Sequence, residues 1–268
     1  MQSKSTAENA VTAAARIPDG RNVLAIASGK GGVGKTWFAI TLAHALSQAG
    51  EKTLLFDGDL GLANVDIQLG LMAERDLGAA LANKLPLKKC ITHFDEGSFD
   101  ILAGRSGSGS LATLPIQKVA MLHMALMNLS KSYDKVIIDL GAGLDRVVRM
   151  LAGKASKSVV ITTDEPTSIA DAYAYIKVTL SDRPDADLRI VVNMAETLEK
   201  GEKTYETLAN ACSNFLGQRP KLAGIVRRDR RVRDAIRSQS PFLTRSPSAE
   251  AAEDIERVAK ELLASFRD

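Results

Sequence analysis

The sequence has few cysteines, few aromatic residues and no long apolar run. Its 268 residues include two cysteines, Cys90 and Cys212, and aromatic side chains make up 4% of the chain. Two cysteines so far apart, without metal-ligand spacing, exclude a disulfide-stapled scaffold and are typical of the reducing cytosol. No stretch approaches the ~18 apolar residues of a membrane span, and the N-terminus lacks the apolar core of a signal peptide.

The charge balance is close to neutral. Thirty-five basic and 32 acidic residues give a formal charge of +3, which by itself does not indicate a nucleic-acid partner. Hydrophobic residues make up 45% of the chain, which is enough for a sizeable core. Residues 1–21 are small, polar and poor in large apolar side chains, so we predict a mobile N-terminal tail there and a single domain over 22–268.

Short apolar runs alternate with helical patterns along the whole chain. Most of the runs are continuously apolar, which is typical of strands buried on both faces of a parallel sheet. The alternation predicts a single-domain, doubly wound α/β fold with a mostly parallel sheet of about seven strands and helices on both faces. The expected strands are 22–28, 53–57, 98–103, 135–139, 158–163, 189–193 and 222–226. The expected helices are 37–49, 115–132, 166–181, 200–216, 230–239 and 248–266.

The strand at 22–28 runs directly into a glycine-rich loop, "GKGGVGKT", and a helical pattern follows at once. This is the phosphate-loop pattern G-x-x-x-x-G-K-[ST] in its strand–loop–helix context. Glycines let successive backbone amides converge on phosphate oxygens at a helix N-terminus. The lysine neutralises the β- and γ-phosphates, and the hydroxyl binds Mg²⁺. The predicted nucleotide-binding residues of the loop are Gly29, Lys30, Gly31, Gly32, Val33, Gly34, Lys35, Thr36 and Trp37.

A second lysine, Lys30, stands near the start of the loop. "KGGVGKT" resembles the deviant phosphate loop of the MinD/ParA family of P-loop ATPases, in which this lysine reaches the nucleotide of the partner subunit. From the residue alone, Lys30 could equally be a solvated loop lysine. The resemblance implies a catalytic role for Lys30 together with Lys35, and a homodimer in the ATP state.

Acidic residues follow two of the expected strands. "LLFDGDLGLANVDIQLGL" (54–71) looks like the family's switch region, which implies that Asp59 positions the attacking water and that Asp57 supports the magnesium shell. Asp139 ends the strand in "YDKVIIDLGAGL", where P-loop ATPases carry a second carboxylate on the magnesium side. The expected metal residues are therefore Thr36, Asp57 and Asp139.

Other segments resemble the flagellar branch of the family, the FlhG/FleN regulators of flagellar number or placement. The most specific is "EPTSIADAYAYIK" (165–177). The resemblance also implies that Asn193 contacts adenine. Three positions depart from the family pattern: Trp37 replaces a small polar residue beside the α-phosphate, Leu140 replaces a hydroxyl residue, and Arg227 replaces a proline. The partner motif common at the N-terminus of flagellar members is missing from residues 1–21.

The expected function is a slow, partner-stimulated Mg²⁺·ATP-dependent switch ATPase that cycles between ATP and ADP states. Two alternatives stay open: a ParA-type partition or cargo-positioning ATPase on the nucleoid, and a non-hydrolysing regulator that sequesters a transcription factor. The resemblance implies a cytoplasmic protein with an FlhF-type GTPase and basal-body or transcription-regulator proteins as partners. A peripheral position at the inner membrane or cell pole stays open.

Two charged segments bear on these alternatives. The segment "RRDRRVRDAIR" (227–237) is open to three interpretations: a solvated helix face, a docking patch for an acidic partner, or a DNA surface. No aromatic residue interleaves its arginines, so nucleic-acid binding is not favoured. Residues 249–268 carry six acids and three bases around an apolar stripe. This composition favours packing on the sheet over a basic membrane anchor.

Overall fold

A computed structural model describes residues 20–72, 75–83, 85–104 and 114–266. One eight-stranded sheet runs through it in the order β3-β4-β2-β5-β1-β6-β7-β8. The pairings are parallel except that of β3 with β4. The strands are β1 (Val23–Ala27), β2 (Thr53–Gly58), β3 (Thr92–Phe94), β4 (Phe99–Leu102), β5 (Lys135–Leu140), β6 (Lys157–Thr162), β7 (Asp187–Ala195) and β8 (Lys221–Arg227).

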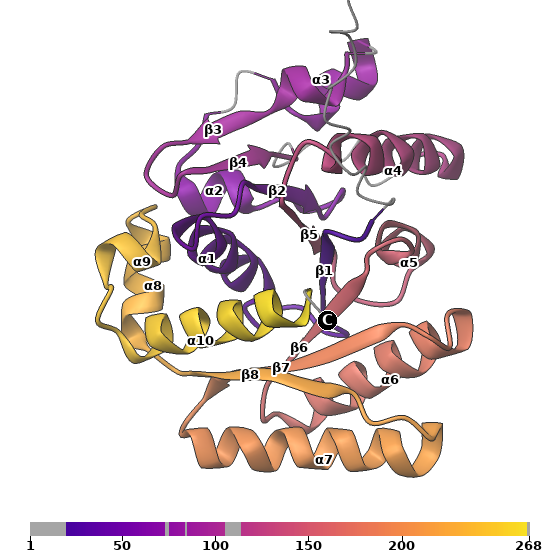
Figure 1. The fold of residues 1–268 in the computed structure, drawn as a ribbon, viewed down its shortest axis with the longest axis vertical. Helices are drawn as coiled ribbons and strands as arrows, with labels where there is room; N and C mark the ends of the chain where they lie inside the picture. Colours follow the sequence, from indigo (N-terminus) through magenta and orange to yellow (C-terminus); the bar gives the residue numbers. More distant parts are fainter. Residues whose placement is uncertain (1–19, 73–74, 84, 105–113, 267–268) are drawn as a thin grey trace, which may run out of the picture.

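Helices cover both faces of this sheet (Figure 1). One apolar core joins the sheet to α3, α4, α5, α6 and α7, and the other joins it to α1, α2, α8, α9 and α10. The helices are α1 (Lys35–Gln48), α2 (Val65–Leu69), α3 (Leu77–Asn83), α4 (Ile116–Ser130), α5 (Arg146–Ala152), α6 (Pro166–Asp182), α7 (Leu198–Leu216), α8 (Arg230–Arg237), α9 (Phe242–Arg245) and α10 (Glu250–Ser265), with a 3₁₀ turn η1 (Leu87–Cys90). The fold is the doubly wound α/β domain predicted from the sequence.

The seven expected strands are present and parallel to one another, and most of them are continuous apolar runs buried on both faces of the sheet. The eighth strand, β3, is an addition at the sheet edge: three residues, "THF", too short and too polar to stand out from the sequence. Four short helices, α2, α3, α5 and α9, were also not predicted, because four to seven residues give little helical periodicity. The predicted tail falls mostly on residues 1–19, outside the described residues, whereas Gly20 and Arg21 form the turn before β1.

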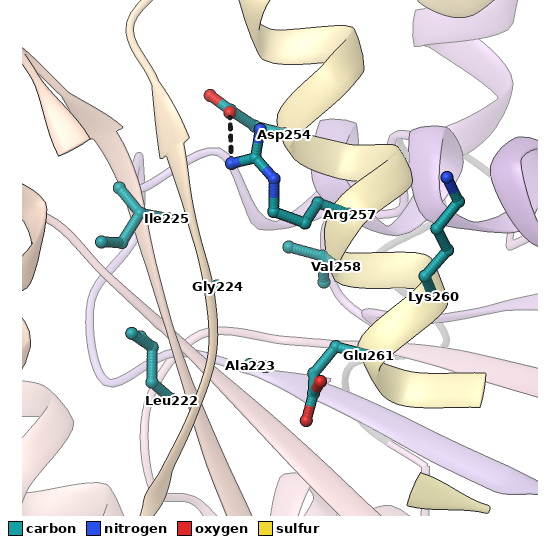
Figure 2. Close-up of a pocket in the computed structure, with 9 residues that line it drawn as sticks. All are labelled: Leu222, Ala223, Gly224, Ile225, Asp254, Arg257, Val258, Lys260 and Glu261. Atoms are coloured by element: carbon teal, nitrogen blue, oxygen red, sulfur yellow. Dashed lines mark hydrogen bonds and ion pairs between the residues drawn. The ribbon is translucent and has the colours of Figure 1, made fainter. Parts of the chain in front are cut away.

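The last helix packs on the sheet as expected. Within α10, Ile255, Val258, Ala259 and Leu262 are buried. The helix lies along β8 with Val258 facing Gly224 (Figure 2). A side chain at Gly224 would begin 2.5 Å from a methyl group of Val258, so the missing side chain permits this close packing. Among the described residues, no helix is both long enough and apolar enough to span a membrane.

A buried ion cluster fixes α10 to the end of β8. Asp254 is fully buried and accepts hydrogen bonds from the backbone N–H of Arg227, at 2.9 Å, and from its guanidinium, at 2.9 and 3.0 Å. Glu250 adds a 2.6 Å ion pair to the same arginine. Arg227, one of the departures from the family pattern, is therefore a structural residue that joins strand to helix.

We predict that Asp254→Ala destabilises the domain by about 3 kcal/mol, because it leaves a largely buried guanidinium without its main partner. Urea unfolding of the purified protein measures the loss. Glu250→Ala is the matched control: its carboxylate is exposed and its loss should cost about 1 kcal/mol or less. Equal effects of the two substitutions would contradict a dominant role for the buried carboxylate.

Candidate nucleotide and magnesium site

The phosphate loop connects β1 to α1 as the sequence predicts. Gly34 lies in the left-handed region with φ 85° and precedes the first residue of α1. No side chain caps this helix end, so the backbone N–H groups of its first turn are available to an anion. A Cβ placed on Gly31 or Gly32 would meet nothing within 4 Å, so the loop leaves open space above these residues. The loop is a cradle for phosphate.

Two glycines hold the loop against the rest of the domain. A Cβ on Gly29 would lie 2.1 Å from the backbone oxygen of Asp171 in α6. A Cβ on Gly34 would lie 2.4 Å from Nδ2 of Asn193 at the end of β7. The Asp171 backbone and the buried Asn193 amide cannot move aside as an exposed side chain could. The absence of a side chain at Gly29 and Gly34 therefore permits the close approach of the loop to α6 and β7.

Asn193 braces the phosphate loop from below. Its buried Nδ2 donates a 2.8 Å hydrogen bond to the carbonyl oxygen of Val33. The amide nitrogen is therefore committed to the loop. A contact between Asn193 and adenine stays a prediction, and in this structure the residue supports the shape of the loop.

Lys35 and Asp139 form a buried ion pair beneath the loop. Lys35 Nζ lies 2.9 Å from Asp139 Oδ1, and the two side chains are 8% and 1% exposed. Asp139 Oδ2 is buried and has no hydrogen-bond partner. Burial raises the pKa of Asp139, which Lys35 opposes. One carboxylate oxygen therefore secures the lysine, and the other is an unsatisfied acceptor.

Asp57 lies beside Asp139 because their strands pair in register, residue against residue. Its Oδ2 accepts hydrogen bonds from the N–H groups of Asn64 and Val65, both at 3.1 Å, and its Oδ1 from that of Asp59 at 3.2 Å. Burial, with the charge of Asp139 adding to it, raises the pKa of Asp57 to about 7. Asp57 therefore shapes the loop that carries Asp59.

Asp59 lies in that loop, partly exposed. Its Oδ1 accepts hydrogen bonds from the N–H of Leu62 at 2.9 Å and from that of Gly61 at 3.3 Å. A Cβ built on Gly141, just after β5, would lie 3.5 Å from the Asp59 carboxyl. Asp59 thus faces the second glycine loop, so the structure brings together the loop acid and the two strand-end acids that the sequence predicted.

The donor set fits magnesium bound with a nucleotide. No group of three or more His, Cys, Asp or Glu side chains in the described part of the chain could hold a metal by itself. Mg²⁺ prefers oxygen ligands and usually combines one or two carboxylates with phosphates and water. Asp139 Oδ2 is an unsatisfied buried oxygen of this kind, and the residue Thr36 lies directly after Lys35. The residues present fit Mg²⁺ brought by a triphosphate.

Lys30 makes contacts within its own chain. Its Nζ lies 2.6 Å from Glu165 Oε2 and donates a 3.0 Å hydrogen bond to Thr167 Oγ1. Lys30 and Glu165 are 36% and 62% exposed, so water screens the pair and its contribution to stability is small. The hydrogen bond from Lys30 lowers the pKa of Glu165. Glu165 and Thr167 belong to the "EPTS" segment noted in the sequence. Their contact with Lys30 could not be predicted from the sequence, because Lys30 and Glu165 are 135 positions apart.

Trp37 turns away from the loop. Its side chain is 6% exposed and packs edge-to-face on Phe242 of α9, with ring centroids 5.3 Å apart. Its indole Nε1 is buried without a partner. The ring therefore packs between α1 and α9. Because the side chain is buried there, the predicted nucleotide contact of Trp37 would be made by its backbone N–H. That contact stays a prediction.

The arginine-rich segment is divided by the fold. Arg227 is bound in the ion cluster with Asp254, and Arg231 pairs with Asp229 at 2.7 Å. Arg228, just before α8, and Arg230, Arg233 and Arg237 on α8 remain, and all four are exposed. The segment therefore presents a smaller basic surface than its composition suggests.

The sequence is similar to those of known proteins over most of its length. The sequence profile of a family named ParA, described as NUBPL iron-transfer P-loop NTPase, matches residues 19–263. The antiactivator FleN of Pseudomonas aeruginosa is 32% identical over 90% of this chain and 85% of its own length. The flagellum site-determining protein YlxH of Helicobacter pylori is 31% identical over 71% of this chain and 64% of its own length.

Solved structures share the fold. The septum site-determining protein MinD of Pyrococcus horikoshii, complexed with Mg-ADP, superposes with a TM-score of 0.77 at 22% identity, over 92% of this chain and 98% of its own. A chain of the MinC:MinD cell division complex of Aquifex aeolicus gives a TM-score of 0.75 at 24% identity, over 91% of this chain and 96% of its own.

The iron transfer named in the family description has no support in the site. The two cysteines, Cys90 and Cys212, are buried, unpaired and in separate elements.

We predict that, without nucleotide, Asp57 makes the protein less stable as pH rises from about 4 to about 7. The folded protein keeps the proton of Asp57 up to pH about 7, whereas the unfolded chain releases it near 3.8. The free energy of unfolding therefore decreases as pH rises through this range, by up to about 1.4 kcal/mol per pH unit. Urea unfolding across this pH range should show a more negative slope for the wild type than for Asp57→Ala. Parallel curves would contradict the raised pKa.

Proposed function

Because this chain belongs to the MinD/ParA family of P-loop NTPases, we propose that it is a Mg²⁺·ATP-dependent dimerising switch ATPase that regulates the number or placement of flagella. The observation that carries the enzymatic part is the ion pair of Lys35 with Asp139, whose second oxygen is an unsatisfied acceptor below an open phosphate cradle.

The charged site residues divide the work of this mechanism. The first-turn N–H groups of α1 and Lys35 would bind the phosphates, and Thr36 and Asp139 would hold the magnesium, with Asp57 supporting its shell. Magnesium bound there would neutralise charge at the γ-phosphate. Asp57 holds the loop of Asp59 through backbone hydrogen bonds, and Asp59 orients the attacking water. Phosphoryl transfer depends on this positioning and on charge neutralisation more than on covalent help.

Two features support a dimer. Lys30 stands at the surface end of the loop, where it can leave Glu165 and reach a nucleotide bound by a second subunit. Leu62 and Ile67, in the segment that follows Asp59, are 75% and 56% exposed, and large exposed apolar side chains of this kind favour a subunit contact. A γ-phosphate buried between two subunits makes assembly depend on ATP, and hydrolysis then becomes a release signal.

The flagellar role is supported by the relatives. FleN is named an antiactivator and YlxH a flagellum site-determining protein. We therefore propose a transcription regulator or a basal-body protein as partner, and an FlhF-type GTPase as a further one, in line with the resemblance of the sequence. The protein would act in the cytoplasm, with slow intrinsic hydrolysis that a partner raises. ATP is proposed as the substrate, and the MinD structure with Mg-ADP supports the nucleotide and the metal.

We predict that Asp59→Ala forms a dimer with Mg·ATP and is a monomer with Mg·ADP, because it binds the triphosphate without hydrolysing it. Multi-angle light scattering measures the mass of each form. Asp59→Ala combined with Lys30→Ala should stay monomeric in both nucleotides, since the cross-subunit lysine is missing.

The controls separate the alternatives. Wild type should hydrolyse ATP slowly, and Asp59→Ala should hydrolyse it at least about a hundredfold more slowly. A protein that binds Mg·ATP yet remains a monomer in every variant would overturn the switch and favour the non-hydrolysing regulator. ATP-dependent, salt-sensitive DNA retention that is lost on neutralising Arg230 and Arg233 would favour the partition ATPase instead.

A further inference from the structure

An apolar groove lies between α3, η1 and the first half of α4, at the upper end of the molecule in Figure 1. Its volume is about 420 Å³. Six of the apolar residues that line it are Leu81, Leu85, Leu87, Met121, Leu122 and Ala125. Met121 is 65% exposed, and Met124, one turn further along α4, is 66% exposed. Large apolar side chains at such exposure are an unpartnered surface, and methionine adapts to varied partners.

The spacing of the lining residues on α4 indicates the shape of an occupant. Lys118, Met121, Leu122 and Ala125 follow the i, i+3, i+4, i+7 pattern of a helix face that packs on another helix. Apart from Leu85 and Pro86, the lining residues belong to helical elements, whose backbone groups are largely hydrogen-bonded within the helices. An extended peptide would leave its own N–H and C=O groups without partners there, whereas a helix satisfies its own.

The charges around the groove indicate the sign of the charge that a partner would carry. The elements α3, η1 and α4 carry three charged residues among those described, Lys88, Lys89 and Lys118, and all three are exposed lysines. Lys118 lines the groove itself, and the other two follow Leu87 in η1. A second copy of this chain would bring lysines against lysines, which is unfavourable.

A lipid surface fits less well than a helix. The floor of the groove includes Leu122 and Ala80, which are 2% and 4% exposed. A flat bilayer would touch the projecting methionines and leave this floor uncovered, whereas a single helix can insert side chains into it. We propose that this groove binds an amphipathic helix of a partner protein, whose apolar stripe is flanked by acidic residues.

The test uses two synthetic peptides of about 18 residues, a length at which helices form. Both carry leucines at i, i+3, i+4 and i+7, and the flanking positions are glutamates in one and lysines in the other. Fluorescence anisotropy measures their binding to the full chain. We expect saturable binding of the glutamate peptide, and at least about tenfold weaker binding of the lysine peptide.

Three variants locate the binding. Met121→Glu places a repelling charge in the groove and should weaken the glutamate peptide about tenfold or more. Lys118→Glu should weaken the glutamate peptide and strengthen the lysine peptide, a reversal that partial unfolding would not produce. Phe215→Glu is the matched control: it makes the same kind of change at a 77% exposed residue of α7, at the lower end of Figure 1, and should leave both affinities unchanged.

Other results would overturn the proposal. Failure of the glutamate peptide to bind wild type, or equal losses in Met121→Glu and Phe215→Glu, excludes an acidic helix in this groove. Sedimentation with phosphatidylglycerol vesicles that Met121→Glu abolishes, without peptide binding, would assign the face to a membrane. A loss of the ATP-dependent dimer in Met121→Glu would assign it to a second copy. The peptide assay needs no nucleotide, so its outcome is independent of the proposed ATPase.

Discussion

Two carboxylates, Asp57 and Asp139, are buried side by side at the ends of β2 and β5, and Lys35 forms a buried ion pair with one of them, Asp139. The parallel register of the two strands imposes this arrangement, since it brings their terminal residues to the same edge of the sheet. Burial disfavours the charged form of each acid and raises the pKa of both. The charge of Asp139 adds to the effect on Asp57, whereas the charge of Lys35 opposes the effect on Asp139. The site therefore has an excess of negative charge that a divalent cation would relieve.

The other parts of the site depend on this pair. Asp139 holds Lys35 under the phosphate loop, and Asp57 holds the backbone at Asn64 and Val65, which sets the path of the loop with Asp59. A core of apolar residues at the two positions would fold with less electrostatic cost. The two buried acids therefore lower the stability of the fold. Such a cost is common at ligand-binding sites, where function requires groups that destabilise the folded state.

The sequence predicted most of the sheet, and it did so where burial is strongest. Continuous apolar runs located most of the seven strands, the strand–loop–helix context singled out Lys35, and the end of an apolar run, together with the family resemblance, singled out Asp139. The edge strand β3 and the short helices escaped because they have too few residues to show a period. The partners of Lys30 and Arg227 escaped for another reason. Glu165 and Asp254 are ordinary acids on distant helices, and only the packing of α6 and α10 brings them to these cations.

Trp37 illustrates how one substitution changes its meaning with the fold. From the sequence alone, a bulky ring directly after Thr36 is expected to weaken the contacts with the α-phosphate. In the structure α1 directs this ring away from the loop and onto Phe242, where it joins α1 to α9. The phosphate contacts of a helix N-terminus come from backbone N–H groups, which any residue other than proline supplies. The ring can thus serve the core while its backbone still faces the phosphate.

The apolar groove and the acid pair are joined by short connections. The N–H of Leu77, where α3 begins, donates a hydrogen bond to the carbonyl oxygen of Ala103 at the end of β4. The next residue, Gly104, lies against Ala63 and close to the carboxyl of Asp57. The residues that follow β4 thus contact α3 on one side and the loop of Asp59 on the other. A helix bound between α3 and α4 would therefore contact an element that is tied to the loop of Asp59.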